Sequence, residues 1–126
     1  MRYDPNREVD SKAWLELDEC VRIELALDYH KRARVELPNA KVHAVVHTVV
    51  ENQAALGDEY PVAEKLRQLV GEGLSRHDAI HAIGSVLMQH VFDVMQDSAK
   101  AEGDLNEPYI RDLATLTAKK WLASGE

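Results

Sequence analysis

The segment KVHAVVHTVVENQ, residues 41–53, is apolar enough for burial and has the residue spacing of an α-helix. Its valines recur every three or four residues, which places them on one face of an α-helix. Along the border of that face lie His43, His47 and Glu51, each four residues after the one before. A helix that could have carried valine there carries imidazole on successive turns.

A second segment, SRHDAIHAIG, residues 75–84, repeats this spacing with His77 and His81. Side chains four residues apart lie one above the other, about 6 Å apart along the helix axis. Two imidazoles so placed can bind one ion. The two segments therefore predict a metal-binding pair of histidines on each of two helices, although the same spacing also suits histidines that only pack and donate hydrogen bonds.

The rest of the chain is also predicted to be helical. No stretch shows the alternation of apolar and polar residues that is typical of strands. Residues 1–126 are expected to form one all-α domain, a helical bundle of about four to five helices, with residues 1–10 as a flexible arm. The expected elements are a short helical turn from Asp10 or Ser11, helices over 19–34 and 39–56, a short helix after Pro61, and helices over 75–99 and from Asn106.

Composition excludes several classes of partner. The 22 acidic and 15 basic residues give a formal charge of −7, which repels nucleic acids and anionic membranes. The single cysteine, Cys20, allows no internal disulfide, and no apolar run is long enough to span a membrane. We expect a cytoplasmic protein with no nucleic-acid or membrane partner, and a homodimer by default because symmetric dimers are common.

The two histidine pairs are expected to face each other. In an up-down-up-down bundle the helices that carry them run parallel, which predicts His43 beside His77 and His47 beside His81. Glu51 is either a residue that orients the ligands of a single ion, a general base, or a ligand shared with a second ion. The catalytic candidates are Glu51 and Asp78. The predicted metal ligands are His43, His47, His77, His81, Glu51 and, as an additional group, His30.

Imidazole ligands suit several transition metals, of which zinc and iron fit best here. Such an ion would support hydrolysis or redox chemistry on an unknown small molecule, with Glu51 or Asp78 as the base. The same ligands in a closed arrangement would suit a metal sensor or carrier without turnover. The third interpretation is a protein-interaction scaffold in which the histidines are structural.

The run LPNAKVHAVVHTVVENQAALGD with PVAEKLRQLVGEGLSRHDAIHAIGSVL resembles a family of small bacterial proteins of unknown function, in which such histidine-bearing helices recur. The resemblance implies a bacterial helical protein and supplies no activity. The order of His30, His47 with Glu51, and His77 with His81 also partly resembles the ligand order of hemerythrin. The last helix, however, has no histidine where a hemerythrin requires one.

Overall fold

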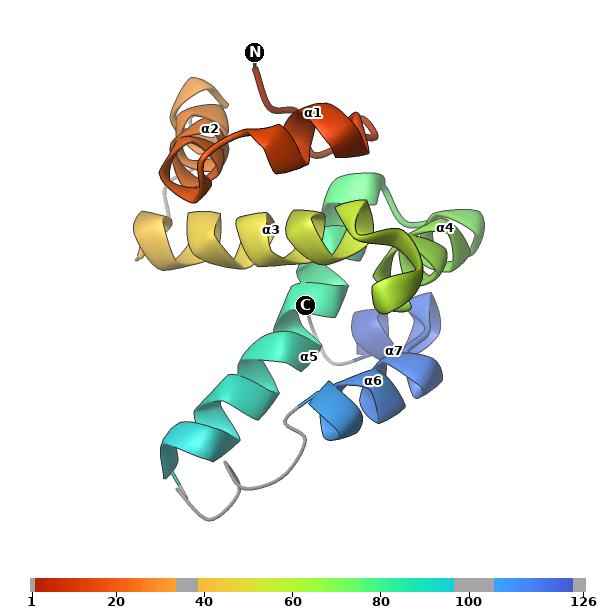
Figure 1. The fold of residues 1–126 in the computed structure, drawn as a ribbon. Helices are drawn as coiled ribbons and strands as arrows, with labels where there is room; N and C mark the ends of the chain where they lie inside the picture. Colours follow the sequence, from red (N-terminus) through yellow and green to blue (C-terminus); the bar gives the residue numbers. More distant parts are fainter. Residues whose placement is uncertain (1, 34–38, 97–105, 124–126) are drawn as a thin grey trace.

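A computed structural model describes residues 2–33, 39–96 and 106–123, and these residues form helices without any strand (Figure 1). The predicted all-α class is confirmed. The described helices are more numerous and shorter than the four or five expected. They are α1 Ser11–Glu16, α2 Glu19–Arg32, α3 Ala40–Ala55, the 3-10 turn η1 Gly57–Glu59, α4 Val62–Gly71, α5 Arg76–Gln96, α6 Asn106–Thr115 and α7 Ala118–Ala123.

Capping residues start the helices where the sequence predicts. The side chain of Asp10 accepts a hydrogen bond from Ala13 N, and that of Asn39 accepts one from Val42 N, at 3.1 Å in both cases. The Ser75 hydroxyl accepts one from Asp78 N at 3.0 Å. Each bond satisfies a backbone donor in the first turn of α1, α3 or α5, which has no partner inside the helix.

The expected single C-terminal helix is divided into α6 and α7. The hydroxyl of Thr117 accepts a hydrogen bond from Lys120 N. Thr117 therefore caps the start of a new helix, α7. The carbonyl of Leu116 is taken by the ammonium group of Lys65 at 3.0 Å. A local cap and a tertiary hydrogen bond thus outweigh the continuous apolar pattern. The predicted end of the preceding helix near Ala99 lies outside the described residues.

Helix α3 occupies the middle of the molecule (Figure 1). In that view α1 and α2 lie on one side of it, α4 lies near its C-terminal end, and α5 crosses it and extends to the other side, where α6 and α7 also lie. One apolar cluster, which includes Trp14 and Ala44, packs α3 against α1 and α2. A larger one, which includes Val50 and Ile83, packs it against α4 to α7. No helix within the described ranges has the length and apolar character needed to cross a membrane.

The segment before α1 is fixed to the body of the protein. Tyr3 is 2% exposed, and Pro5 is also fully buried. The carbonyl of Pro5 accepts a hydrogen bond from Arg76, and the side chain of Asn6 accepts one from His77 N at the start of α5. The expected flexible arm is therefore replaced, over these residues, by a segment that connects to α3 and α5.

Helices α3 and α5 cross instead of running parallel (Figure 1). At the crossing, a Cβ atom added to Gly84 would lie 2.6 Å from Cγ1 of Val46, so glycine is needed for the helices to approach this closely. The predicted parallel arrangement is wrong because α3 and α5 pack directly against each other at an angle, with Gly84 at their point of contact. Gly84, which sequence analysis did not use to set direction, fixes the crossing point.

Candidate metal centre

Five histidines from three helices converge between α2, α3 and α5. Each offers one ring nitrogen, and these atoms lie within 4.8 Å of one another. His30 and His47 are buried, whereas the other three are partly exposed. The members of this histidine cluster are His30 of α2, His43 and His47 of α3, and His77 and His81 of α5.

The neighbours inside the cluster follow from the crossing of the helices. Nε2 of His47 lies 3.1 Å from Nε2 of His81, as the expected layers require. The expected pairing of His43 with His77 is wrong: Nε2 of His43 lies 3.0 Å from Nε2 of His81. The ring of His77 instead packs against His47 and His30, with centroids 5.0 and 5.8 Å apart.

Hydrogen bonds fix which nitrogen His30 offers. Its Nδ1 lies 2.7 Å from the carbonyl oxygen of Ala26, one helical turn earlier. A carbonyl oxygen only accepts, so Nδ1 carries the proton and Nε2 of the neutral ring keeps a lone pair. This Nε2 is buried and has no hydrogen-bond partner, and the same is true of Nε2 of His77. Two unpaired buried nitrogens in one cluster are costly unless something binds them.

His47 is oriented from behind by the N-terminal segment. Its Nδ1 lies 3.1 Å from the hydroxyl of Tyr3, which donates its own proton to Oε2 of Glu51 at 2.7 Å. Burial and the neighbouring Glu51 raise the pKa of Tyr3, so the hydroxyl keeps its proton. Because that proton goes to Glu51, Nδ1 of His47 donates to the tyrosine oxygen. Nε2 of His47 is then the unprotonated nitrogen, and it faces the cluster.

Glu51 is engaged on both carboxylate oxygens and lies outside the cluster. The two terminal nitrogens of Arg76 bind Oε1 and Oε2 at 2.7 and 2.8 Å, and the Glu51 side chain is fully buried. Burial alone would lower the pKa of Arg76, but the hydrogen bonds and charge of Glu51 raise it. These contacts argue against the expected roles of Glu51 as ligand or base. They fit the alternative in which Glu51, through Tyr3, orients a ligand.

Four imidazoles of the cluster have a lowered pKa, which favours their neutral form at pH 7. Burial, with the nearby rings of His81 and His30, lowers the pKa of His43 from 6.5 to about 4. Burial, with the nearby ring of His77, lowers the pKa of His81 to about 4 as well. Burial and the same kind of repulsion lower the pKa of His47 and of His77. Neutral imidazole is the form that binds a metal ion.

The spacing of the nitrogens suits a single ion. Metal to imidazole bonds are about 2.1 Å long, so nitrogens bound at right angles are about 3.0 Å apart and opposite ones about 4.2 Å apart. Two pairs stand at 3.0 and 3.1 Å, and the whole set lies within 4.8 Å. Nitrogens at such spacings could together hold one ion.

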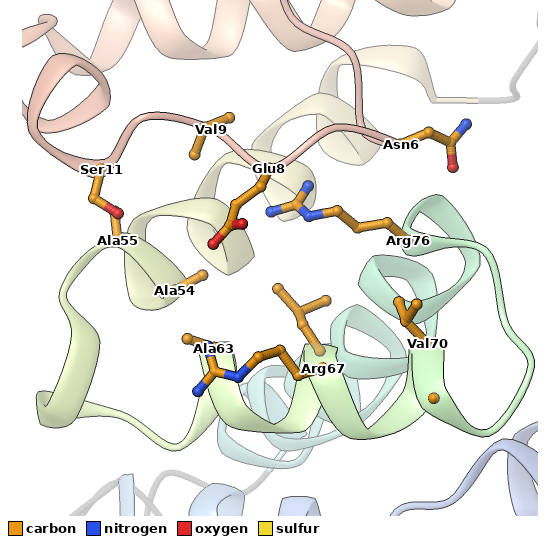
Figure 2. A pocket seen from close by; sticks show the side chains of 12 residues that line it. Asn6, Glu8, Val9, Ser11, Ala54, Ala55, Ala63, Arg67, Val70 and Arg76 are labelled. Atoms are coloured by element: carbon orange, nitrogen blue, oxygen red, sulfur yellow. The ribbon is translucent and has the colours of Figure 1, made fainter.

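A cavity of about 460 Å³ opens on the exposed side of the cluster, and His43 and His81 form part of its wall. Asp78 is exposed and lines the same cavity. A second cavity, of about 450 Å³, lies beyond Arg76 (Figure 2). Its lining includes Arg67 and Glu8 but none of the clustered histidines, so it is separate from the site.

Sequence reasoning missed Tyr3 and Arg76. Arg76 had a signal, because it directly precedes His77 and a buried Glu51 needs a cation. Tyr3 had no such signal in the sequence, because it lies 44 positions from His47 and no local pattern connects the two. His90 lies apart from the cluster and contacts Asp112 at 2.8 Å.

Comparison of the chain with models of protein families, with curated proteins and with solved structures finds no match. The case for a function therefore comes from the site itself. The histidine cluster could hold a metal ion.

Proposed function

We propose that this protein binds one divalent transition metal ion, zinc or iron, through the Nε2 atoms of the histidine cluster, and that the ion acts on a small molecule. The observation that carries the proposal is the pair of buried, unpartnered Nε2 atoms of His30 and His77 within a group of five convergent imidazoles. A scaffold with structural histidines would leave those nitrogens unsatisfied, at a cost of about 1–3 kcal/mol each.

The surroundings of the cluster favour a metal site in which one coordination position is open to a small molecule. The cavity beside His43 and His81 gives a small molecule access to the side of the cluster that protein does not cover. A closed arrangement, as in a sensor or carrier, would have protein on that side as well. We therefore favour metal-dependent chemistry over storage or sensing.

The chemistry follows from the identity of the ion. Bound zinc lowers the pKa of a coordinated water to about 7 and supports hydrolysis, whereas iron supports redox reactions. Asp78 is the predicted catalytic carboxylate that a molecule in the cavity can reach, and we propose it as a contact for that molecule. Glu51 is proposed as the group that, through Tyr3, holds His47 in place.

The resemblance to hemerythrin extends only to the order of the helical histidines. The described part of the final helices supplies no histidine to the cluster. Glu51 binds Arg76 and is not part of the cluster. The geometry favours a single ion over the two-ion centre of that family. A bacterial origin, a cytoplasmic location and a homodimer stay predictions of the sequence.

Elemental analysis of protein purified without a histidine tag tests the proposal. We expect about one equivalent of zinc or iron per chain, bound by the five imidazoles. His77→Ala should reduce that content strongly, because it removes a ligand, whereas His90→Ala should leave it unchanged. A wild-type protein that contains no metal, and takes up none when zinc or iron(II) is added, would contradict the proposal.

A further inference from the structure

The cavity beside the cluster has walls whose chemistry indicates what it binds. Four of its side chains are apolar: Val42, Val46, Met88 and Trp121. Gly84 and Ser85 add little bulk between them. At about 460 Å³, the cavity falls in the range of about 300–1,000 Å³ that is typical of small-molecule sites. It would take a compact apolar body.

The histidine side of the cavity favours a charged group instead of an apolar one. All five proposed ligands are imidazoles, which bind a metal ion in their neutral form, and the buried carboxylate of Glu51 is already paired with Arg76. A divalent ion held there would keep its full charge, so its free position favours an anionic donor atom. Asp78 lies exposed at the cavity, where water screens its charge, and it does not cancel that of the ion.

We propose that the cavity binds a small monocarboxylate with an apolar body, its carboxylate oxygen on the ion and its body between Val42 and Met88. This inference rests on the proposed metal site and names the class of molecule that the site takes. The imidazoles of His43 and His81 line the same cavity as the apolar side chains, so one molecule could place its carboxylate on the ion and its body against those side chains. Hydrophilic anions of the same charge would lose the contribution of the walls.

Titration of cobalt(II)-loaded protein tests this, because the visible spectrum of cobalt changes when a ligand enters its coordination sphere. The probes are benzoate and acetate, which share a carboxylate and differ in their apolar body. We expect benzoate to bind at least about tenfold more tightly than acetate, a difference of about 1.4 kcal/mol. Val42→Ser and Met88→Ser should each bring the two affinities closer together by weakening benzoate alone.

The matched control is Met95→Ser, which changes a methionine of the same helix that is 79% exposed and lies outside the cavity lining. It should leave the ratio of affinities unchanged. Stoichiometric cobalt binding with equal affinities for benzoate and acetate, or a ratio that Met88→Ser does not change, overturns the inference and leaves the metal site intact. A protein that binds no cobalt overturns both.

Discussion

Among single residues, Tyr3 has the most demanding position, because one hydroxyl group joins a proposed ligand to a buried ion pair. It accepts from Nδ1 of His47 and donates to Glu51, which Arg76 holds in turn. Groups that hold a metal-binding histidine in this way fix both its tautomer and its orientation. On the proposed ion, Tyr3 would act through His47.

Tyr3→Phe should weaken metal binding while keeping the fold, since it removes the hydroxyl and leaves the ring. Loss of such a supporting hydrogen bond typically costs about tenfold to 100-fold in metal affinity. Competition with a chromophoric chelator measures the affinity. The control is Tyr109→Phe, which removes another buried hydroxyl, one that donates to Gln53 at 2.6 Å. Equal metal affinities in the two variants would contradict the role of Tyr3.

The sequence identifies the histidines that come together in the cluster, but not the residues that orient them. The spacing of four residues identifies His43, His47, His77 and His81 because a helix repeats its face at that interval. His30 follows more weakly from its apolar stripe. Tyr3 and the pairing of His43 with His81 depend on tertiary packing, which no local pattern encodes.

At the scale of secondary structure, the crossing of α3 and α5 decides which imidazoles meet. Gly84 makes this approach possible, since Cγ1 of Val46 occupies the place of its missing side chain. The helix starts at Asp10, Asn39 and Ser75 were predictable because caps are local. The break between α6 and α7 was not, because the hydrogen bond from Lys65 to the Leu116 carbonyl forms only in the folded protein.

Gly84→Ala should destabilise the protein, because the added methyl group forces α3 and α5 apart. Overpacking of this kind costs about 1–3 kcal/mol, which chemical denaturation measures. Val46→Ala in the same chain should recover part of the loss by making room. As a control, Gly71→Ala adds a methyl group where nothing lies within 4 Å, and should have little effect or stabilise α4 slightly. Additive effects of the Gly84 and Val46 substitutions would contradict the proposed contact.

For the whole molecule, the all-α class follows from helical periodicity and the capping residues, but the arrangement of the helices does not. Two apolar clusters lie on opposite sides of α3, and the histidines lie where α2, α3 and α5 meet. The partly polar interface between those helices couples stability to protonation and, under the proposed function, to metal binding.

The metal-free protein should become less stable as the pH falls from about 7 toward 4. In the folded state the pKa of His43 and of His81 is lowered from 6.5 to about 4. At a pH below the ordinary histidine pKa of 6.5, the unfolded chain therefore binds protons that the folded chain excludes. Proton binding then favours unfolding. Denaturation midpoints at several pH values in the presence of a chelator measure this.

The control for this pH dependence is a variant with His43→Gln and His81→Gln, whose stability should vary less over the same range. Added zinc should raise the midpoint of the wild-type protein at pH 7, because the ion binds the folded state preferentially. A wild-type profile as flat as that of the double variant would contradict the argument.

The hydrogen bonds between Tyr3 and α3 also limit when the site can form during synthesis of the chain. Tyr3 is synthesised before the residues that it contacts, which lie 44 and 48 positions later in the chain. Arg76, His77 and His81 follow after those. A nascent chain therefore lacks part of the histidine cluster until its α5 segment has emerged, so the proposed ion would be bound only after that stage of translation.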